Sequence, residues 1–279
     1  LPENFDLIIM NPPFTRATGR VGEEFAGKER GLFGFVTDEE SRNAMLLRLK
    51  ELRNKVQEDL LYIATGLPRS QIPEPIADVI SGRSQELSEF VNIGQAGEGL
   101  LFLYLTYKKA NNNGIISFVL PKNLLSGVSW FLARSLLVSK FNLKYVIASS
   151  DSEKGYNFSE GTNLSEILLV AQRKDNHADD EETNFVVLLK KPRNSLEAVS
   201  YAESIIGGWN QNAVIIKAKR KDLLRNIANW GVFVAFNDPL LVDEALSVMD
   251  GKLKGNKIPI SNLGRIAERA SSRSEEHTS

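Results

Sequence analysis

Short apolar runs alternate with longer amphipathic segments along most of the chain. Short runs rich in apolar side chains are typical of buried strands, and apolar residues at helical spacing are typical of helices. We expect strands at 5–10, 115–120, 143–149, 167–172, 185–189 and 214–216. We expect helices at 38–61, 99–110, 130–140 and 195–206. Helices that alternate with strands in this way indicate an α/β fold with a mostly parallel sheet.

Turn residues set the expected ends of several elements. Asn111-Asn112-Asn113-Gly114 is a helix C-cap signal, so the helix at 99–110 is expected to end there, ahead of the next strand. The stretch Thr15 to Arg30 is rich in glycine and charge and predicts a mobile loop. The acidic stretch Asp175 to Thr183 predicts a solvated loop.

Composition excludes some kinds of site. The chain has 279 residues and no cysteine, so it holds no disulfide and no thiolate zinc site. Its two histidines, His177 and His277, lie far apart in polar sequence, and we expect neither a metal site nor a histidine-based triad. No apolar run reaches the roughly 18–20 residues of a membrane span, and no signal peptide is visible, which fits a cytoplasmic protein with no membrane partner.

The net charge of −1 does not indicate nucleic-acid binding by the chain as a whole. Any contact with DNA would have to come from a local patch. One basic run could meet phosphates, although such runs are more often solvated faces; its members are Lys217, Lys219, Arg220, Lys221 and Arg225.

The turn Asn11-Pro12-Pro13-Phe14 directly follows the first apolar run. Neither proline can donate a backbone hydrogen bond, so the strand must end there. The Asn11 amide is then held at the carboxyl end of a strand, where open α/β sheets bind ligands. Phe14 follows closely enough to stack on a flat group. The tetrapeptide therefore fits the task of gripping an exocyclic amine on an aromatic ring.

Four segments, taken in order, resemble one protein family. They are Asp6-Leu-Ile-Ile-Met-Asn-Pro-Pro-Phe14, Phe102, Gly114-Ile-Ile-Ser-Phe-Val-Leu-Pro121-Lys-Asn-Leu-Leu125, and Asn157-Phe158-Ser159 leading into Glu166-Ile-Leu-Leu-Val-Ala-Gln-Arg-Lys174. The chain resembles the C-terminal part of an N6-adenine DNA methyltransferase of the gamma arrangement, as found in restriction–modification systems. The family uses S-adenosylmethionine as its cofactor and double-stranded DNA as its substrate.

The resemblance implies a Rossmann-like class I methyltransferase fold, of which this chain carries only the C-terminal half of the sheet. Residues 1–232 correspond to the C-terminal part of the catalytic domain, and 233–272 to the start of a target-recognition domain. The chain starts at Leu1, and the family's Gly-rich cofactor strand would lie upstream. Residues 273–279 match the translation of a common sequencing adapter, or are a genuine polar tail. We expect this polypeptide alone to bind S-adenosylmethionine poorly and to methylate nothing.

The resemblance also assigns roles to individual residues. Asn11 and the Pro12 carbonyl would accept hydrogen bonds from the adenine amine, and Phe14 would stack on the extruded base. Phe158 resembles the family's second stacking aromatic, with Tyr156 as a nearby rival and core packing as the alternative. Pro13 and Phe102 would line the cofactor; an ordinary core position is equally open for Phe102. No metal is implied.

For the parent protein we expect site-specific adenine methylation of DNA, with a restriction or specificity subunit as a further partner. Two alternatives stay open. One is a protein-glutamine or RNA N-methyltransferase, which shares Asn-Pro-Pro but usually continues with Tyr. The other is a non-catalytic DNA-recognition or assembly subunit that kept the fold after losing activity. The intact Asn11–Phe14 turn argues against such decay.

Overall fold

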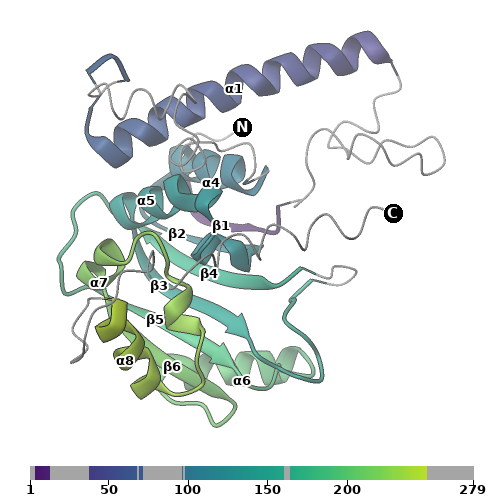
Figure 1. Cartoon of the computed structure of the whole chain (residues 1–279). Coiled ribbons are helices and arrows are strands. Elements are labelled where there is room, and N and C mark those ends of the chain that lie inside the picture. Colours follow the sequence, from purple (N-terminus) through teal and green to yellow (C-terminus); the bar gives the residue numbers. More distant parts are fainter. Residues whose placement is uncertain are drawn as a thin grey trace, which may run out of the picture. The chain divides into compact units, whose positions relative to one another are not determined.

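A computed structural model describes residues 4–12, 38–67, 69–71, 96, 98–159 and 164–249 (Figure 1). In these residues the strands are β1 (Phe5–Met10), β2 (Ala110–Pro121), β3 (Phe141–Ser149), β4 (Glu166–Arg173), β5 (Glu182–Leu188) and β6 (Ala213–Lys219). The helices are α1 (Glu39–Thr65), α4 (Glu98–Lys109), α5 (Phe131–Lys140), α6 (Ser195–Ile206), α7 (Arg220–Arg225) and α8 (Pro239–Met249). Single 3₁₀ turns are η1 (Arg69–Gln71), η3 (Lys122–Leu125), η4 (Val128–Trp130) and η5 (Gly231–Val234).

The expected strands and helices are confirmed in kind, with ends shifted by a few residues. Their caps explain where several of them begin and end. Asp38 accepts a hydrogen bond from the Ser41 N–H at the start of α1, and Gly66, in the left-handed region, closes its far end.

By its internal contacts the chain divides into units 1–242 and 243–279, and the sheet lies in the first. The domain boundary expected after residue 232 stays a prediction.

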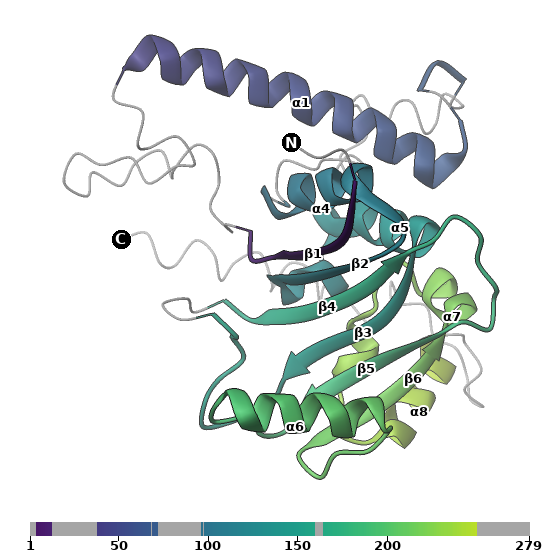
Figure 2. The ribbon, with the colours of Figure 1, turned by 180° about the vertical axis from the view of Figure 1, so that it is seen from behind.

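The described strands form one six-stranded sheet in the order β1-β2-β4-β3-β5-β6 (Figure 2). The expected mostly parallel arrangement is wrong. Two pairs, β1–β2 and β3–β5, are parallel, whereas β2–β4, β3–β4 and β5–β6 are antiparallel. The reason lies in the segment 150–165, whose described residues contain no helix. Without a crossover helix β4 returns antiparallel to β3 and inserts between β3 and β2.

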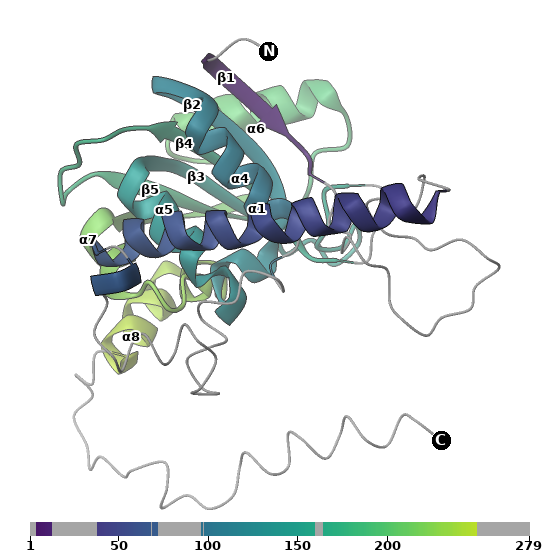
Figure 3. The same cartoon turned by 90° about the horizontal axis from the view of Figure 1, so that it is seen from above.

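Helices cover both faces of this sheet (Figure 3). On one face α4 and α5 lie over alternate buried residues of the strands, such as Ile116, Phe118 and Leu120 of β2, and α1 lies outside α4 and α5. On the other face α6 packs over β3, β5 and β6, where Val186, Leu188 and Ile205 form a buried cluster. None of the described helices is long and apolar enough to cross a membrane.

The Asn-rich turn at 111–114 lies inside a strand, which corrects the expected helix C-cap. Strand β2 already begins at Ala110, directly after α4. Phe5 pairs with Ala110 and Leu7 with Ile115, so the residues between form a bulge in β2. Asn113 has φ of 66°, and a Cβ on Gly114 would lie 2.9 Å from the Phe5 carbonyl oxygen. The same turn chemistry therefore lets two strands approach closely instead of ending a helix.

The acidic segment 175–183 is only partly the solvated loop that was expected. Asp179 and Asp180 are exposed, but Glu181 is half-buried and β5 begins at Glu182. The Glu181 carboxylate accepts from Lys174 Nζ and lies 3.1 Å from His177 Nδ1. The His177 side chain is only 5% exposed, so this histidine helps to anchor the segment.

Candidate functional site

The carboxyl ends of several strands lie together at one end of the sheet, which we call its carboxyl edge. The opposite end of the sheet, where these strands begin, is its opposite edge. Strands β1, β2, β3 and β5 run in the same direction and end at the carboxyl edge, while the antiparallel β4 begins there. Pro121 at the end of β2 pairs with Glu166 at the start of β4, and Ser149 pairs with Leu188. The carboxyl ends of parallel strands are where α/β sheets bind ligands.

Asn11 follows β1 at this edge with its side chain exposed, whereas Pro12 is buried. Asn11 Nδ2 donates a hydrogen bond of 3.3 Å to Ser159 Oγ. Two segments that lie 148 residues apart in sequence are therefore in contact. Pro13 and Phe14, both expected in the site, lie outside the described residues.

The loop before β4 bends at Phe158 and Ser159. Glu166 Oε2 accepts hydrogen bonds from the N–H groups of Phe158 at 2.6 Å and Ser159 at 2.7 Å. The Glu166 N–H donates to the Tyr156 carbonyl at 3.0 Å. Glu166 is fully buried, and its second oxygen, Oε1, has no hydrogen-bond partner in the part of the chain that the structure describes. One carboxylate thus fixes the turn that faces Asn11.

A second carboxylate fixes the start of the same loop. Asp151, which is 3% exposed, accepts from the N–H groups of Lys191 at 2.7 Å, Glu153 at 2.8 Å and Lys154 at 2.9 Å. Hydrogen bonds from the Lys191 and Lys154 backbone hold the pKa of Asp151 below its usual value. Lys191 Nζ donates in turn to the carbonyls of Lys154 and Asn157, each at 2.6 Å.

The Phe158 ring is half-buried between the core and a lysine side chain. It packs against the buried cluster beneath α6, and Lys191 Nζ lies 6.0 Å from its centroid. Burial lowers the pKa of Lys191 despite the nearby Asp151 charge. Phe158 is half-buried, while Tyr156 beside it is 52% exposed. Phe158 therefore takes part in core packing without being fully buried.

Phe102 lies on α4 and is half-buried. Thr106, one helical turn further on and hence on the same side of the helix, has its Oγ1 3.8 Å from Met10 Sδ at the end of β1. Glu98, one turn earlier, is buried and pairs with Arg53 of α1 at 2.5 Å. This side of α4 therefore extends from α1 towards the strand that precedes Asn11.

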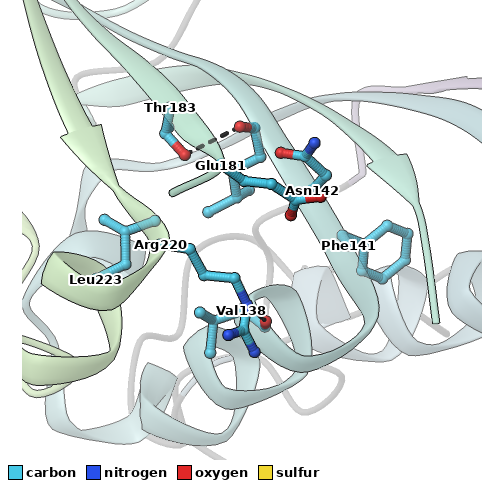
Figure 4. A pocket seen from close by; sticks show the side chains of 8 residues that line it. Val138, Phe141, Asn142, Glu181, Thr183, Arg220 and Leu223 are labelled. Atoms are coloured by element: carbon cyan, nitrogen blue, oxygen red, sulfur yellow. Dashed lines mark hydrogen bonds between the residues drawn. The ribbon is translucent and has the colours of Figure 1, made fainter. Parts of the chain in front are cut away.

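The opposite edge of the sheet contains a small hollow among residues of α5, β3, β5 and α7 (Figure 4). Its polar side chains bond to the protein itself: Thr183 Oγ1 donates to the Leu143 carbonyl at 2.9 Å, and Arg220 Nε to the Val138 carbonyl at 3.2 Å. These contacts hold strands and helices together. The hollow lies away from Asn11 and Ser159, and we assign it no ligand.

The positive charge of the basic run on β6 and α7 is partly neutralised by acidic side chains. Lys217 pairs with Glu182 at 3.2 Å, and Arg220 pairs with Asp179 at 3.4 Å.

At the candidate site, burial lowers the pKa of Lys122, which follows β2 directly. Among the described residues, no three or more His, Cys, Asp or Glu side chains cluster in a way that could hold a metal ion.

Three residues of this site were given no role on the basis of the sequence: Asp151, Glu166 and Lys191. Glu166 had one visible signal, a carboxylate at the first position of an otherwise apolar strand. Asp151 and Lys191 gave no comparable signal, because their backbone partners lie up to 40 residues away in sequence.

No family model and no curated protein matches the chain. Among solved structures it is similar to the type IIG restriction endonuclease BpuSI, with 17% identity over 81% of this chain and 20% of that chain, and a TM-score of 0.43. It is also similar to the type I restriction–modification methyltransferase subunit from Streptococcus thermophilus, with 14% identity over 82% of this chain and 37% of that chain, and a TM-score of 0.43. The type I restriction enzyme EcoKI M protein follows, with 10% identity over 61% of this chain and 47% of that chain, and a TM-score of 0.37.

The chain thus spans less than half the length of each of these proteins.

Proposed function

We propose that this chain is part of an N6-adenine DNA methyltransferase and supplies the residues that hold the target base. The observation that carries the proposal is the contact between Asn11 and Ser159. It joins the Asn-Pro-Pro-Phe turn to the Asn157-Phe158-Ser159 segment at the carboxyl edge of the sheet. These are two of the four segments on which the family resemblance rests.

The proposed chemistry needs hydrogen-bond acceptors at one place. The lone pair of the adenine N6 amine is delocalised into the ring, which makes the nitrogen a poor nucleophile. Asn11 Oδ1 and the Pro12 carbonyl would each accept a hydrogen bond from one N–H of this amine and draw its nitrogen towards tetrahedral geometry. Charge develops on this nitrogen during transfer, so fixed dipoles around it lower the barrier. The N–CH3 bond would form as the S–CH3 bond of the sulfonium breaks and a thioether leaves, and the methylated nitrogen would then lose one proton to water. Neither a covalent nucleophile nor an acid–base dyad would be required.

Aromatic side chains would hold the extruded base. Phe14 would stack on one face, and Phe158, already fixed by Glu166 and the cluster beneath α6, would meet it from another side. Stacking on an aromatic contributes about 1–3 kcal/mol per base. Substituting Phe158 and Tyr156 separately by Ala, with 2-aminopurine at the target position, would show which ring holds the base.

The proposed cofactor is S-adenosylmethionine, which supplies an electrophilic methyl group. Phe102 fits a role beside it, because this half-buried ring lies on the side of α4 that extends to the end of β1. Pro13 would contribute from the turn. The partners proposed for the whole protein are double-stranded DNA and a restriction or specificity subunit.

The test is methylation of plasmid DNA by the protein encoded by the complete reading frame. Removing the Asn11 acceptor by Asn11→Ala should lower N6-methyladenine formation by about 100-fold or more. Asn112→Ala, which changes an exposed asparagine in the β2 bulge, is the matched control and should retain full activity. Equal methylation by Asn11→Ala and wild type would refute the role of Asn11.

The same assay separates the alternatives. Labelled methyl groups on protein or RNA, with none on DNA, would favour the protein-glutamine or RNA enzyme. DNA binding without methyl transfer to any substrate would favour a non-catalytic subunit.

A further inference from the structure

The side-chain amide of Asn11 has two ends with opposite hydrogen-bonding roles, since Nδ2 donates and Oδ1 accepts. In the structure Nδ2 donates to Ser159 Oγ at 3.3 Å, and among the described residues Oδ1 accepts no hydrogen bond. We propose that Ser159 is a positioning residue that presents Asn11 Oδ1 to the amine of the target base, with Glu166 holding Ser159 in place. This inference rests on the proposed function and adds two residues to it.

The orientation of the amide matters because the substrate group is itself a donor. An amide rotated by half a turn about its last bond would present N–H groups to the N–H groups of the amine. Asn11 is exposed, so burial alone does not prevent that rotation. A hydroxyl that accepts from Nδ2 favours the productive orientation, in which Oδ1 faces the amine.

Ser159 can direct Asn11 only if Ser159 is itself fixed. Its N–H and that of Phe158 both donate to Glu166 Oε2, at 2.7 and 2.6 Å. Glu166 is fully buried at the first position of β4, where its own backbone bonds to Tyr156. Hydrogen bonds to a carboxylate are stronger than those to a neutral acceptor. The turn is therefore anchored to the sheet, and Phe158 and Ser159 are fixed together.

The distribution of Glu166 hydrogen bonds supports a role in this turn. Both bonds that its carboxylate makes go to Phe158 and Ser159, while Oε1 is left without a partner in the described part of the chain. Burying a carboxylate is costly unless it is well hydrogen-bonded. A turn that served only to connect β3 and β4 could be closed by neutral groups at lower cost.

The first arm of the test needs no activity and uses the 279-residue chain itself. Heteronuclear NMR signals of the Asn11 side-chain amide are assigned by their loss in Asn11→Asp. They should move in Ser159→Ala and stay in place in Ser159→Thr, which keeps the hydroxyl. Ser152→Ala, an exposed serine in the same loop, is the control and should leave them unchanged. Unmoved Asn11 signals in Ser159→Ala would overturn the proposal.

The second arm uses the methylating parent protein. Ser159→Ala should lower kcat about tenfold, the value of one hydrogen bond, with little change in KM for DNA. Ser159→Thr should restore kcat to within about threefold of wild type. An unchanged kcat in Ser159→Ala would overturn the positioning role. If the wild-type parent transfers no methyl group, the proposed function fails, and the NMR arm alone decides whether Ser159 orients Asn11.

Discussion

The two edges of the sheet both bury polar side chains, but they use them differently. At the edge where β3 and β5 begin, the polar groups bond to one another or to nearby backbone: Glu181 contacts Lys174 and His177, and Thr183 bonds to Leu143. At the edge where these strands end, Asp151 and Glu166 bond to the backbone of one loop. Here, within the part of the chain that the structure describes, Glu166 Oε1 has no hydrogen-bond partner and Asn11 is exposed. The comparison indicates that polar contacts at the first edge join strands and helices, whereas those at the second hold one loop in place beside Asn11.

The largest effect on stability is expected at Glu166. Glu166→Ala removes both acceptor bonds of the turn and leaves two N–H groups without their partner. We expect a loss of about 2–4 kcal/mol in the free energy of unfolding, measured by urea titration. Glu166→Gln, which retains one acceptor oxygen, should lose about 1 kcal/mol.

Thr183→Val provides the counterpart at the opposite edge. It removes the buried hydrogen bond to the Leu143 carbonyl while keeping the side-chain shape, and should cost about 1–2 kcal/mol. The sharper contrast is in activity: Thr183→Val should leave methylation by the parent protein unchanged, whereas Glu166→Gln should lower it. Equal effects of both variants on activity would remove the distinction between the edges.

The acid sensitivity of the two edges should differ in its response to salt. The pKa of Asp151 is held low by backbone N–H groups. Burial raises the pKa of Glu181, but hydrogen bonds from Lys174 and His177 and their charges outweigh it, so the net change is downward. For a carboxyl with a lowered folded pKa, stability is present above its unfolded pKa of about 4 and is lost as pH falls through the folded value.

Asp151→Asn and Glu181→Gln should therefore each reduce the loss of unfolding free energy between about pH 6 and pH 3. Added salt should weaken the contribution of Glu181, because half-exposed lysine charge is screened, and should change that of Asp151 less. Urea titrations at low and high salt measure both. A steeper acid transition in Asp151→Asn than in wild type would contradict the assignment.

Local patterns predicted the elements but not how they combine. The segment Ser195–Ile206 forms α6 as its spacing indicated, because capping by Asn194 and an apolar side towards the sheet are local properties. The prediction of a mostly parallel sheet failed at β4, because the direction of a strand depends on the path of the segment that leads to it. Hydrophobic periodicity carries no information about that path. The sequence indicated a turn at Asn111–Gly114 but assigned it to the end of a helix, whereas it forms a bulge in β2. The same residue types suit both kinds of turn.

The candidate site divides in the same way. Asn11 and Phe158 carried motifs, and the contact between Asn11 and Ser159 places these motifs together. The partners of the supporting carboxylates Asp151 and Glu166 could not be predicted, because they are backbone N–H groups, which every residue except proline possesses. The one signal in the sequence is a carboxylate at the first position of an otherwise apolar strand, at Glu166, and it does not identify these partners.

The smallest effect is expected in the basic run on β6. Lys217 is 61% exposed and pairs with Glu182 at the edge of the sheet remote from Asn11. Lys217→Gln should change the unfolding free energy by less than about 1 kcal/mol, since exposed ion pairs contribute little. If this run is a solvated face, DNA affinity of the parent protein and its dependence on salt should also be unchanged. A lysine that contacts phosphate would instead lower the slope of log affinity against log salt by about 0.9 when removed. If Lys217→Gln lowered this slope by about 0.9, DNA would contact β6. The edge of the sheet remote from Asn11 would then also bind a ligand, which contradicts the distinction between the two edges.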